Sequence, residues 1–275
     1  MKYKLVTLSV FVLLSLTTKA QQLSKPIWES KNLPVPESVL YGAAEKKLYV
    51  SLIDGTAAAK DGKGGIAVLN ADGTVNNANW VEGLNAPKGL TQYKKTLFVA
   101  DINTVVSIDI LTGKIIDKVA IENAVFLNDV TVDDKGVVYV SDTRTHKIYR
   151  IKNGQSELYL ENVTNANGLK WINKKLYVLA DTELLKIDEK KNRTVVAKGF
   201  EKPGDGVEQL KNGDFIVSCW AGLIYYVKAN GEISKLQDVQ GKMNTADLGY
   251  NAKENVLYIP TFNHNSVIAY KLLAN

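Results

Sequence analysis

The chain has 275 residues, of which 45% are hydrophobic and 23% are charged, an ordinary balance for a single soluble domain. Setting aside Lys2, Lys4 and Lys19 near the N-terminus lowers the formal charge from +5 to +2, so nothing in the charge calls for a nucleic-acid partner. Cys219 is the only cysteine, which excludes an internal disulfide, and its place in a strand pattern predicts a buried side chain.

Residues 1–20 have the features of a cleaved secretory signal peptide. A basic start at Lys2 and Lys4 precedes an apolar run at residues 5–16, and Thr18-Lys-Ala20 resembles a small-x-small cleavage site. The run is too short to span a bilayer of about 30 Å, and no cysteine follows the cleavage site to carry a lipid. We therefore expect a periplasmic or secreted protein without a stable membrane anchor.

Residues 21–275 are predicted to form one domain built from six repeats. Each repeat has a polar residue, a small residue, a short apolar strand, a turn and a second strand, most clearly at residues 166–181. The repeats begin at intervals of 51, 40, 39, 38 and 41 residues, at Glu37, Lys88, Asn128, Asn167, Asp205 and Ala246. A period near 40 made of short strands is typical of a β-propeller with one four-stranded blade per repeat. The longer first interval contains a Gly/Ala/Lys-rich insertion at residues 54–65.

Alternation and turn residues predict the strands within a blade. In the third repeat, strands near 137–141, 147–152 and 157–161 are separated by Asp/Gly and Asn/Gly turns, and the fifth repeat has turns at 210–213 and 228–231. No helix longer than two turns is predicted. After Ala246 only three strands remain, near 246–250, 256–261 and 266–272, so we expect residues 25–30 to supply the fourth strand and close the ring.

The first strand of every blade lines the central channel, so the six repeat-start residues should meet near the axis. Two carboxylates and two carboxamides among them would form an all-oxygen site, which suits a hard cation such as Ca²⁺. Two buried acids with only Lys88 beside them would be costly to desolvate without a cation or a proton. The alternative is that these short polar residues cap the inner strands or bind water in the channel.

Four motifs resemble the successive inner-strand motifs of the regucalcin/gluconolactonase (senescence marker protein-like) family. They are Pro36-Glu37, Asn128-Asp129 after Phe126-Leu127, Asn167-Gly168-Leu169, and Asp205-Gly206 followed by Trp220-Ala221-Gly222. That family consists of six-bladed, calcium-dependent lactonases, with paraoxonase-like, strictosidine synthase-like and NHL-repeat propellers as more distant relatives. The likeness covers residues 33–272.

The resemblance implies roles for particular residues. Glu37, Asn167 and Asp205 would bind one divalent cation, most readily Ca²⁺, with Asn128 as a further ligand or a substrate contact. Asp129 and Asp205 would be the candidate general bases. The ion would polarise a lactone carbonyl and lower the pKa of a bound water.

Departures from the family pattern fall around the substrate. Phe126 stands where gluconolactonase-like members have arginine, Lys88 stands where paraoxonase-like members have a catalytic histidine, and Gly206 replaces a further asparagine ligand. We therefore expect a retained metal ring and an altered substrate pocket, in which Lys88, Asn128 and Trp220 contact the substrate.

The sequence is compatible with two functional classes. No P-loop spacing and no Gly-x-Ser-x-Gly elbow is present, so the sequence predicts neither a nucleotide site nor a serine hydrolase. The first class is an exported metal-dependent hydrolase acting on a lactone or related ester. The second is a non-catalytic, NHL-like propeller that presents its loops to a protein or glycan and holds an ion for structural support.

Overall fold

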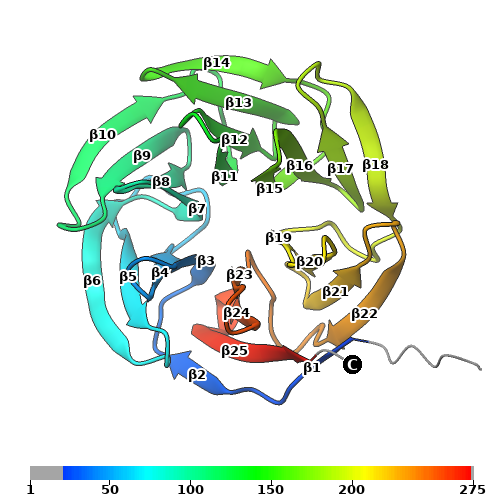
Figure 1. The fold of residues 1–275 in the computed structure, drawn as a ribbon. Coiled ribbons are helices and arrows are strands. Elements are labelled where there is room, and N and C mark those ends of the chain that lie inside the picture. The colour runs from blue at the N-terminus through cyan, green and yellow to red at the C-terminus, as the bar shows by residue number, and fades with distance from the viewer. Residues whose placement is uncertain (1–20, 274–275) are drawn as a thin grey trace, which may run out of the picture.

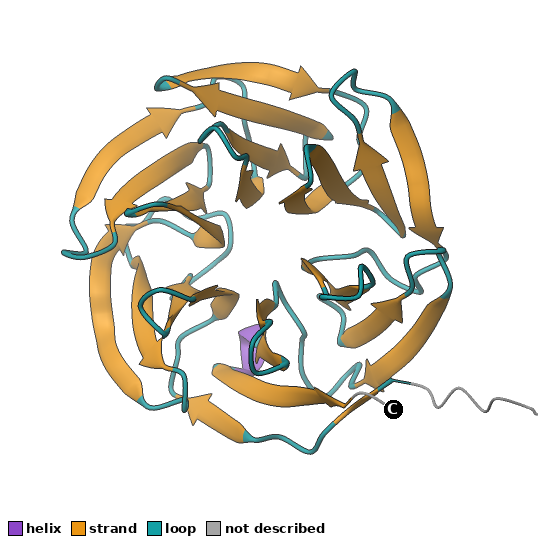
Figure 2. Cartoon of the chain, viewed as in Figure 1, coloured by secondary structure: helices purple, strands orange, loops and turns teal. Residues whose placement is uncertain are grey.

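The computed structural model describes residues 21–273, which form a closed ring of six antiparallel blades around a central axis (Figures 1 and 2). This confirms the predicted all-β, six-bladed propeller. The predicted signal peptide at residues 1–20 lies outside the described residues. Among residues 21–273, the only helical segment is the short 3₁₀ turn η1 (Phe262–His264), and no helix is long and apolar enough to cross a membrane.

Each of the first five blades has four strands in chain order, and the first of them lies nearest the axis (Figure 1). Blade one contains β3 (Pro36–Gly42), β4 (Lys47–Leu52), β5 (Gly64–Asn70) and β6 (Val75–Leu84). Blade two contains β7 (Pro87–Tyr93), β8 (Thr96–Asp101), β9 (Thr104–Asp109) and β10 (Ile115–Ala120). Blade three contains β11 (Leu127–Val132), β12 (Val138–Asp142), β13 (Lys147–Lys152) and β14 (Gln155–Leu160).

The fourth and fifth blades repeat this arrangement. Blade four contains β15 (Ala166–Ile172), β16 (Lys175–Ala180), β17 (Glu183–Ile187) and β18 (Arg193–Lys198). Blade five contains β19 (Val207–Gln209), β20 (Phe215–Cys219), β21 (Leu223–Val227) and β22 (Ile233–Asp238). The outer strands, such as β10, are largely exposed, whereas middle strands such as β12 are buried throughout.

Blade six is completed by the N-terminal end of the described chain, as predicted. It contains β23 (Gly249–Asn251), β24 (Val256–Pro260) and β25 (Ser266–Leu273). Two short N-terminal strands, β1 (Gln22–Leu23) and β2 (Trp28–Lys31), pair antiparallel with opposite ends of β25. The closing strand therefore comes in two pieces, with a break between them.

The inner strand of blade six is shorter than the predicted range of 246–250. The backbone of Asp247 pairs with the neighbouring blade, because its N–H donates to the Glu37 carbonyl (3.0 Å) and its carbonyl accepts from the Val39 N–H (3.2 Å). Asp247 and Ser38 form a parallel bridge between blades six and one. These bonds to blade one delay the start of β23 until Gly249.

The hydrophobic core is divided among the six seams between blades. Six clusters of buried side chains each join residues from two adjacent blades. At the seam between blades three and four, for example, the rings of Tyr139 and Trp171 stack with centroids 5.2 Å apart. Burying these faces supplies the main driving force for closing the ring, since each blade leaves two apolar faces that only its neighbours can cover.

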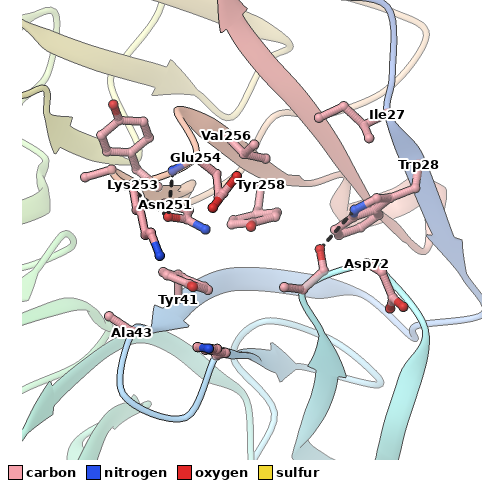
Figure 3. Close-up of a pocket in the computed structure, with 14 residues that line it drawn as sticks. Ile27, Trp28, Tyr41, Ala43, Asp72, Asn251, Lys253, Glu254, Val256 and Tyr258 are labelled. Carbon is pink, nitrogen blue, oxygen red and sulfur yellow. Dashed lines mark hydrogen bonds between the residues drawn. The ribbon is translucent and has the colours of Figure 1, made fainter.

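Trp28 fastens the closing strand to the first blade. Its ring stacks on Tyr258 with a centroid separation of 5.7 Å, and its Nε1 donates a hydrogen bond of 3.2 Å to the carbonyl of Ala71 in the β5–β6 turn. Figure 3 shows Trp28 at the wall of a cavity of about 740 Å³ that Tyr41 and Tyr258 also line. Trp28 belongs to a strand of blade six but contacts blade one, so it holds the two ends of the ring together.

Replacing Trp28 with alanine should lower the free energy of unfolding by about 3 kcal/mol, because the substitution removes a large packed ring and an inter-blade hydrogen bond. Urea denaturation measures this loss. The neighbouring Ile27 is half exposed, and Ile27→Ala serves as the control with an expected change of about 0.5 kcal/mol. Equal losses of unfolding free energy in the two variants would show that Trp28 does not hold the two ends of the ring together.

Candidate metal centre

The six repeat-start residues lie at the same end of the channel. Glu37, Lys88, Asn128 and Asn167 are each the second residue of an inner strand, while Asp205 comes two residues before β19. The inner strands of the six blades surround the axis (Figure 1), and these residues stand at equivalent positions at or just before the strand starts, so they converge on one opening, here called the channel mouth. Ala246 contributes no polar group there.

Most of the polar mouth residues are buried, and two of them are hydrogen-bonded to each other. Glu37 and Asp205 are only 4% and 3% exposed, and Lys88 is also buried. The Asn167 amide nitrogen donates to Asp205 Oδ1 over 2.7 Å, and the Asn128 amide nitrogen donates to Thr143 Oγ1 over 3.1 Å. Each amide therefore donates from its nitrogen to another side chain, and its oxygen is available to bind a ligand.

Two carboxylate oxygens at the mouth accept no hydrogen bond from any residue between 21 and 273. They are Glu37 Oε2 and Asp205 Oδ2, which are both buried. Buried polar atoms are almost always paired, because an unpaired one costs the desolvation free energy of that group. Either a cation or a proton would satisfy two such atoms from different blades.

Burial dominates the electrostatics of this cluster. It raises the pKa of Glu37 well above its usual value, and the negative charge of Asp205 raises it further, while Lys88 opposes the shift. Burial likewise raises the pKa of Asp205 to about 7, against the opposing hydrogen bond from Asn167. The same desolvation lowers the pKa of Lys88 to about 8 despite the nearby Glu37. Lys88 thus compensates the two acids only in part.

The donor set fits a hard divalent cation. Glu37 and Asp205 offer unpaired carboxylate oxygens, and Asn128 and Asn167 offer amide oxygens that accept no hydrogen bond from residues 21–273. Within that range no three or more His, Cys, Asp or Glu side chains gather closely enough to hold an ion by themselves. The candidate centre therefore depends on its amide oxygens, which are ligands that suit Ca²⁺ better than Zn²⁺ or Cu²⁺.

Asp129 lies one residue deeper in the channel, and both of its carboxylate oxygens are used. Oδ1 accepts from the Val130 N–H (2.7 Å), and Oδ2 accepts from the Leu169 N–H in the next blade (2.5 Å). Both bonds hold the Asp129 carboxylate in place, and the one from Leu169 links β11 to β15. They favour Asp205 over Asp129 as the carboxylate that is free to take a proton, and the base role of Asp129 stays a prediction.

Sequence reasoning did not single out Asp247, which occupies the same repeat position as Asp129, one residue after the repeat start. Ser38 Oγ donates to Asp247 Oδ2 over 2.5 Å, and burial together with the charges of Asp129 and Glu37 raises the pKa of Asp247 well above its usual value. Applying the repeat spacing to the second residue of each motif would have found it.

Gly206 sits at a position too tight for the asparagine that paraoxonase-like sites carry. A Cβ atom there would lie 2.6 Å from both Asp247 Oδ1 and the Leu248 backbone nitrogen. No side chain fits without moving blade six. The presence of glycine rather than asparagine at position 206 thus has a packing cause. The expected metal ligands therefore come from four of the six blades.

The rim of the mouth carries aromatic side chains. Lys88 Nζ lies 4.4 Å from the ring centroid of Phe126 and donates to the Ala86 carbonyl over 2.9 Å. Trp220, in the β20–β21 turn, is 43% exposed and makes an edge contact with Phe262, their centroids lying 5.4 Å apart. Lys88, Asn128 and Trp220 therefore lie at the end of the channel where a substrate would approach.

Several other polar or reactive residues make structural contacts. His146 Nδ1 accepts the Asn165 N–H over 2.9 Å, and Asp101 and Asp142 accept backbone N–H groups that hold loops together. Cys219 is buried in β20, as predicted, and burial raises the pKa of its thiol to about 12, which disfavours reactivity.

Comparison with solved structures supports the fold. The chain is similar to a gluconolactonase from Xanthomonas campestris (TM-score 0.69, 13% identity, 94% of this chain and 96% of that chain). It is also similar to a catalytically inactive virginiamycin B lyase from Staphylococcus aureus solved with quinupristin (TM-score 0.65, 13% identity, 92% and 100%). No family model and no curated protein matches the sequence. At such identities the likeness confirms the six-bladed fold that the resemblance implied.

Without a bound ion, stability should fall as the pH rises. The folded pKa of Asp205 is about 7 and that of Glu37 is also raised, so the folded state binds more protons than the unfolded state from about pH 4 to 7. We expect the unfolding free energy in a chelator to drop by about 2–4 kcal/mol between pH 5 and 8. Urea denaturation at each pH measures the drop.

The variant Asp205→Asn should make this pH profile less steep, because it removes one of the buried carboxyls whose pKa is raised. Excess Ca²⁺ at pH 8 should raise the unfolding free energy of the unmodified protein by about 3 kcal/mol at a hundredfold excess over its dissociation constant. An unfolding free energy that does not change with pH in the unmodified protein would show that burial does not raise the pKa of Glu37 and Asp205.

Proposed function

We propose that this protein is a calcium-dependent hydrolase that opens a lactone or a related ester at the channel mouth. The observation that carries the proposal is the pair of buried, unpaired carboxylate oxygens, Glu37 Oε2 and Asp205 Oδ2, on different blades of one opening. A purely structural ring of strand caps would be expected to pair these atoms within the protein. Their lack of donors favours a binding site over a capping role.

Glu37, Asn128, Asn167 and Asp205 would hold the ion. Ca²⁺ bound there would polarise the ester carbonyl, stabilise the developing oxyanion and acidify a bound water. The remaining chemistry belongs to the chain. Asp205 would be the candidate general base, because its Oδ2 accepts no hydrogen bond from residues 21–273 and could take the proton of the attacking water. Lys88 Nζ donates one hydrogen bond to the Ala86 carbonyl and has further N–H groups to offer a substrate oxygen.

Asp129, the second candidate base, would also serve this mechanism as a positioning residue. Its bonds to Val130 and Leu169 fix the inner strands of blades three and four, which carry Asn128 and Asn167. The gluconolactonase among the structural neighbours supports the choice of a lactone. A lyase shares the same fold, so the fold alone does not select the reaction, and the mass of the product must show the addition of water.

The proposal extends to the predicted signal peptide, which would direct the mature chain to the periplasm or the medium. N-terminal sequencing of protein recovered from those fractions should begin at Gln21. An intact N-terminus in the cytoplasmic fraction would contradict export without affecting the proposed chemistry.

A panel of neutral lactones should be hydrolysed in the presence of Ca²⁺, with activity lost in a chelator and restored by added ion. Glu37→Gln and Asp205→Asn should each lower kcat/KM by at least about a hundredfold, because each substitution removes an anionic ligand. Asp205→Asn also removes the proposed general base. Mass spectrometry of the products checks that one water has been added.

Glu208→Gln is the matched control. Glu208 lies on the channel but farther from the mouth, where it pairs with Lys170 over 2.7 Å. This variant should keep activity within about threefold, while calorimetry should show that only the two mouth variants lose ion binding. Ion binding without turnover of any lactone would instead support the non-catalytic, NHL-like propeller.

A further inference from the structure

Arg144 lies at the channel mouth with its charge unpaired. It is exposed, in the turn between β12 and β13, and its guanidinium carbon lies 4.4 Å from the ring centroid of Phe126. No carboxylate among residues 21–273 comes within ion-pair distance of it, and its side chain donates no hydrogen bond to any of them. Stacking on a ring leaves the planar edge of the guanidinium free for a bidentate partner.

The backbone beneath this stack is fixed by Asp142. The buried Asp142 carboxylate accepts the N–H groups of Val125 and Phe126 from one segment. It also accepts those of Arg144 and Thr145 from another. The two segments that carry the ring and the guanidinium are thus tied to a single side chain. Arg144 therefore starts from a supported backbone, which reduces the entropy lost when it binds a ligand.

A second cation contacts the same ring. Lys88 Nζ also lies 4.4 Å from the Phe126 centroid, and the positive charge of Arg144 is one of the causes that lower the pKa of Lys88. Two cations beside one aromatic ring repel each other, and an anion bound between them or at their edge would relieve that repulsion. Two positive charges therefore lie against Phe126, the residue that stands where gluconolactonase-like members have arginine.

This positive corner adjoins the candidate metal centre. Thr143, the residue before Arg144, accepts the hydrogen bond from the Asn128 amide, and Phe126 precedes Asn128 by two residues. Elsewhere on the rim, Trp220 and Phe262 from blades five and six form an apolar edge. A substrate whose ester lies over the ion would meet a cation in blade three and an aromatic surface across the mouth.

We propose that Arg144 determines specificity by binding an anionic group, a carboxylate or a phosphate, on a substrate whose apolar part rests against Trp220 and Phe262. This inference deepens the proposed function and rests on it for the reacting bond. Arg144 acts on binding and takes no part in the proton transfer.

The test compares dihydrocoumarin derivatives that carry a carboxylate, a phosphate or a neutral amide on the aromatic ring. The unmodified protein should show a kcat/KM about tenfold higher for at least one anionic derivative than for the amide. Arg144→Gln should abolish that preference, mainly through KM, and Arg144→Lys should keep part of it. Arg150→Gln is the matched control, since Arg150 pairs with Glu157 in the same blade and should leave the preference intact.

Binding measurements separate this inference from the proposed function. Calorimetry with benzoate, phenyl phosphate and benzamide should show anion binding that Arg144→Gln weakens about tenfold. Anion binding without hydrolysis of any lactone would overturn the proposed function and keep the anion site. Hydrolysis with equal kcat/KM for charged and neutral derivatives, unaffected by Arg144→Gln, would overturn the anion site and keep the hydrolase. Neither binding nor hydrolysis would overturn both.

Discussion

The close approach of six inner strands around one axis is the constraint on which this structure depends. The strands approach so closely that the carboxyl groups of Glu37 and Asp205 lose contact with water, and burial raises the pKa of both. Charged groups buried in this way need a compensating partner. The same geometry that closes the ring therefore requires a compensating proton or cation at the mouth.

The second residue of each inner-strand motif governs how the blades meet. Asp129 and Asp247 bridge to neighbouring blades through hydrogen bonds to a backbone N–H and a hydroxyl, respectively. Gly206 instead allows the chain of blade six to pass within contact of its own backbone. These residues fix the first residues of the motifs in place, which is the support that a metal centre needs from residues that do not bind the ion.

Features outside the six-bladed ring distinguish this chain from other propellers. Solved propellers of the same shape include a gluconolactonase and a lyase, so blade number and closure do not select a chemistry. In this chain the distinguishing features are in the turns at the mouth, where Phe126, Arg144 and Trp220 combine positive charge with aromatic surface. Turns tolerate change because they contribute little to the packed seams, whereas the inner strands are held by contacts on both sides.

The sequence by itself determined the blade number, the closing strand and the four oxygen-bearing residues of the candidate centre, because a repeated spacing of polar and apolar residues constrains where each strand begins. Only the tertiary structure decided what the neighbours of those residues are. Contacts such as Asp129 with Leu169, Ser38 with Asp247, and Arg144 with Phe126 join segments from different strands or blades. No local pattern encodes them, since each depends on the distance between segments after the ring has closed.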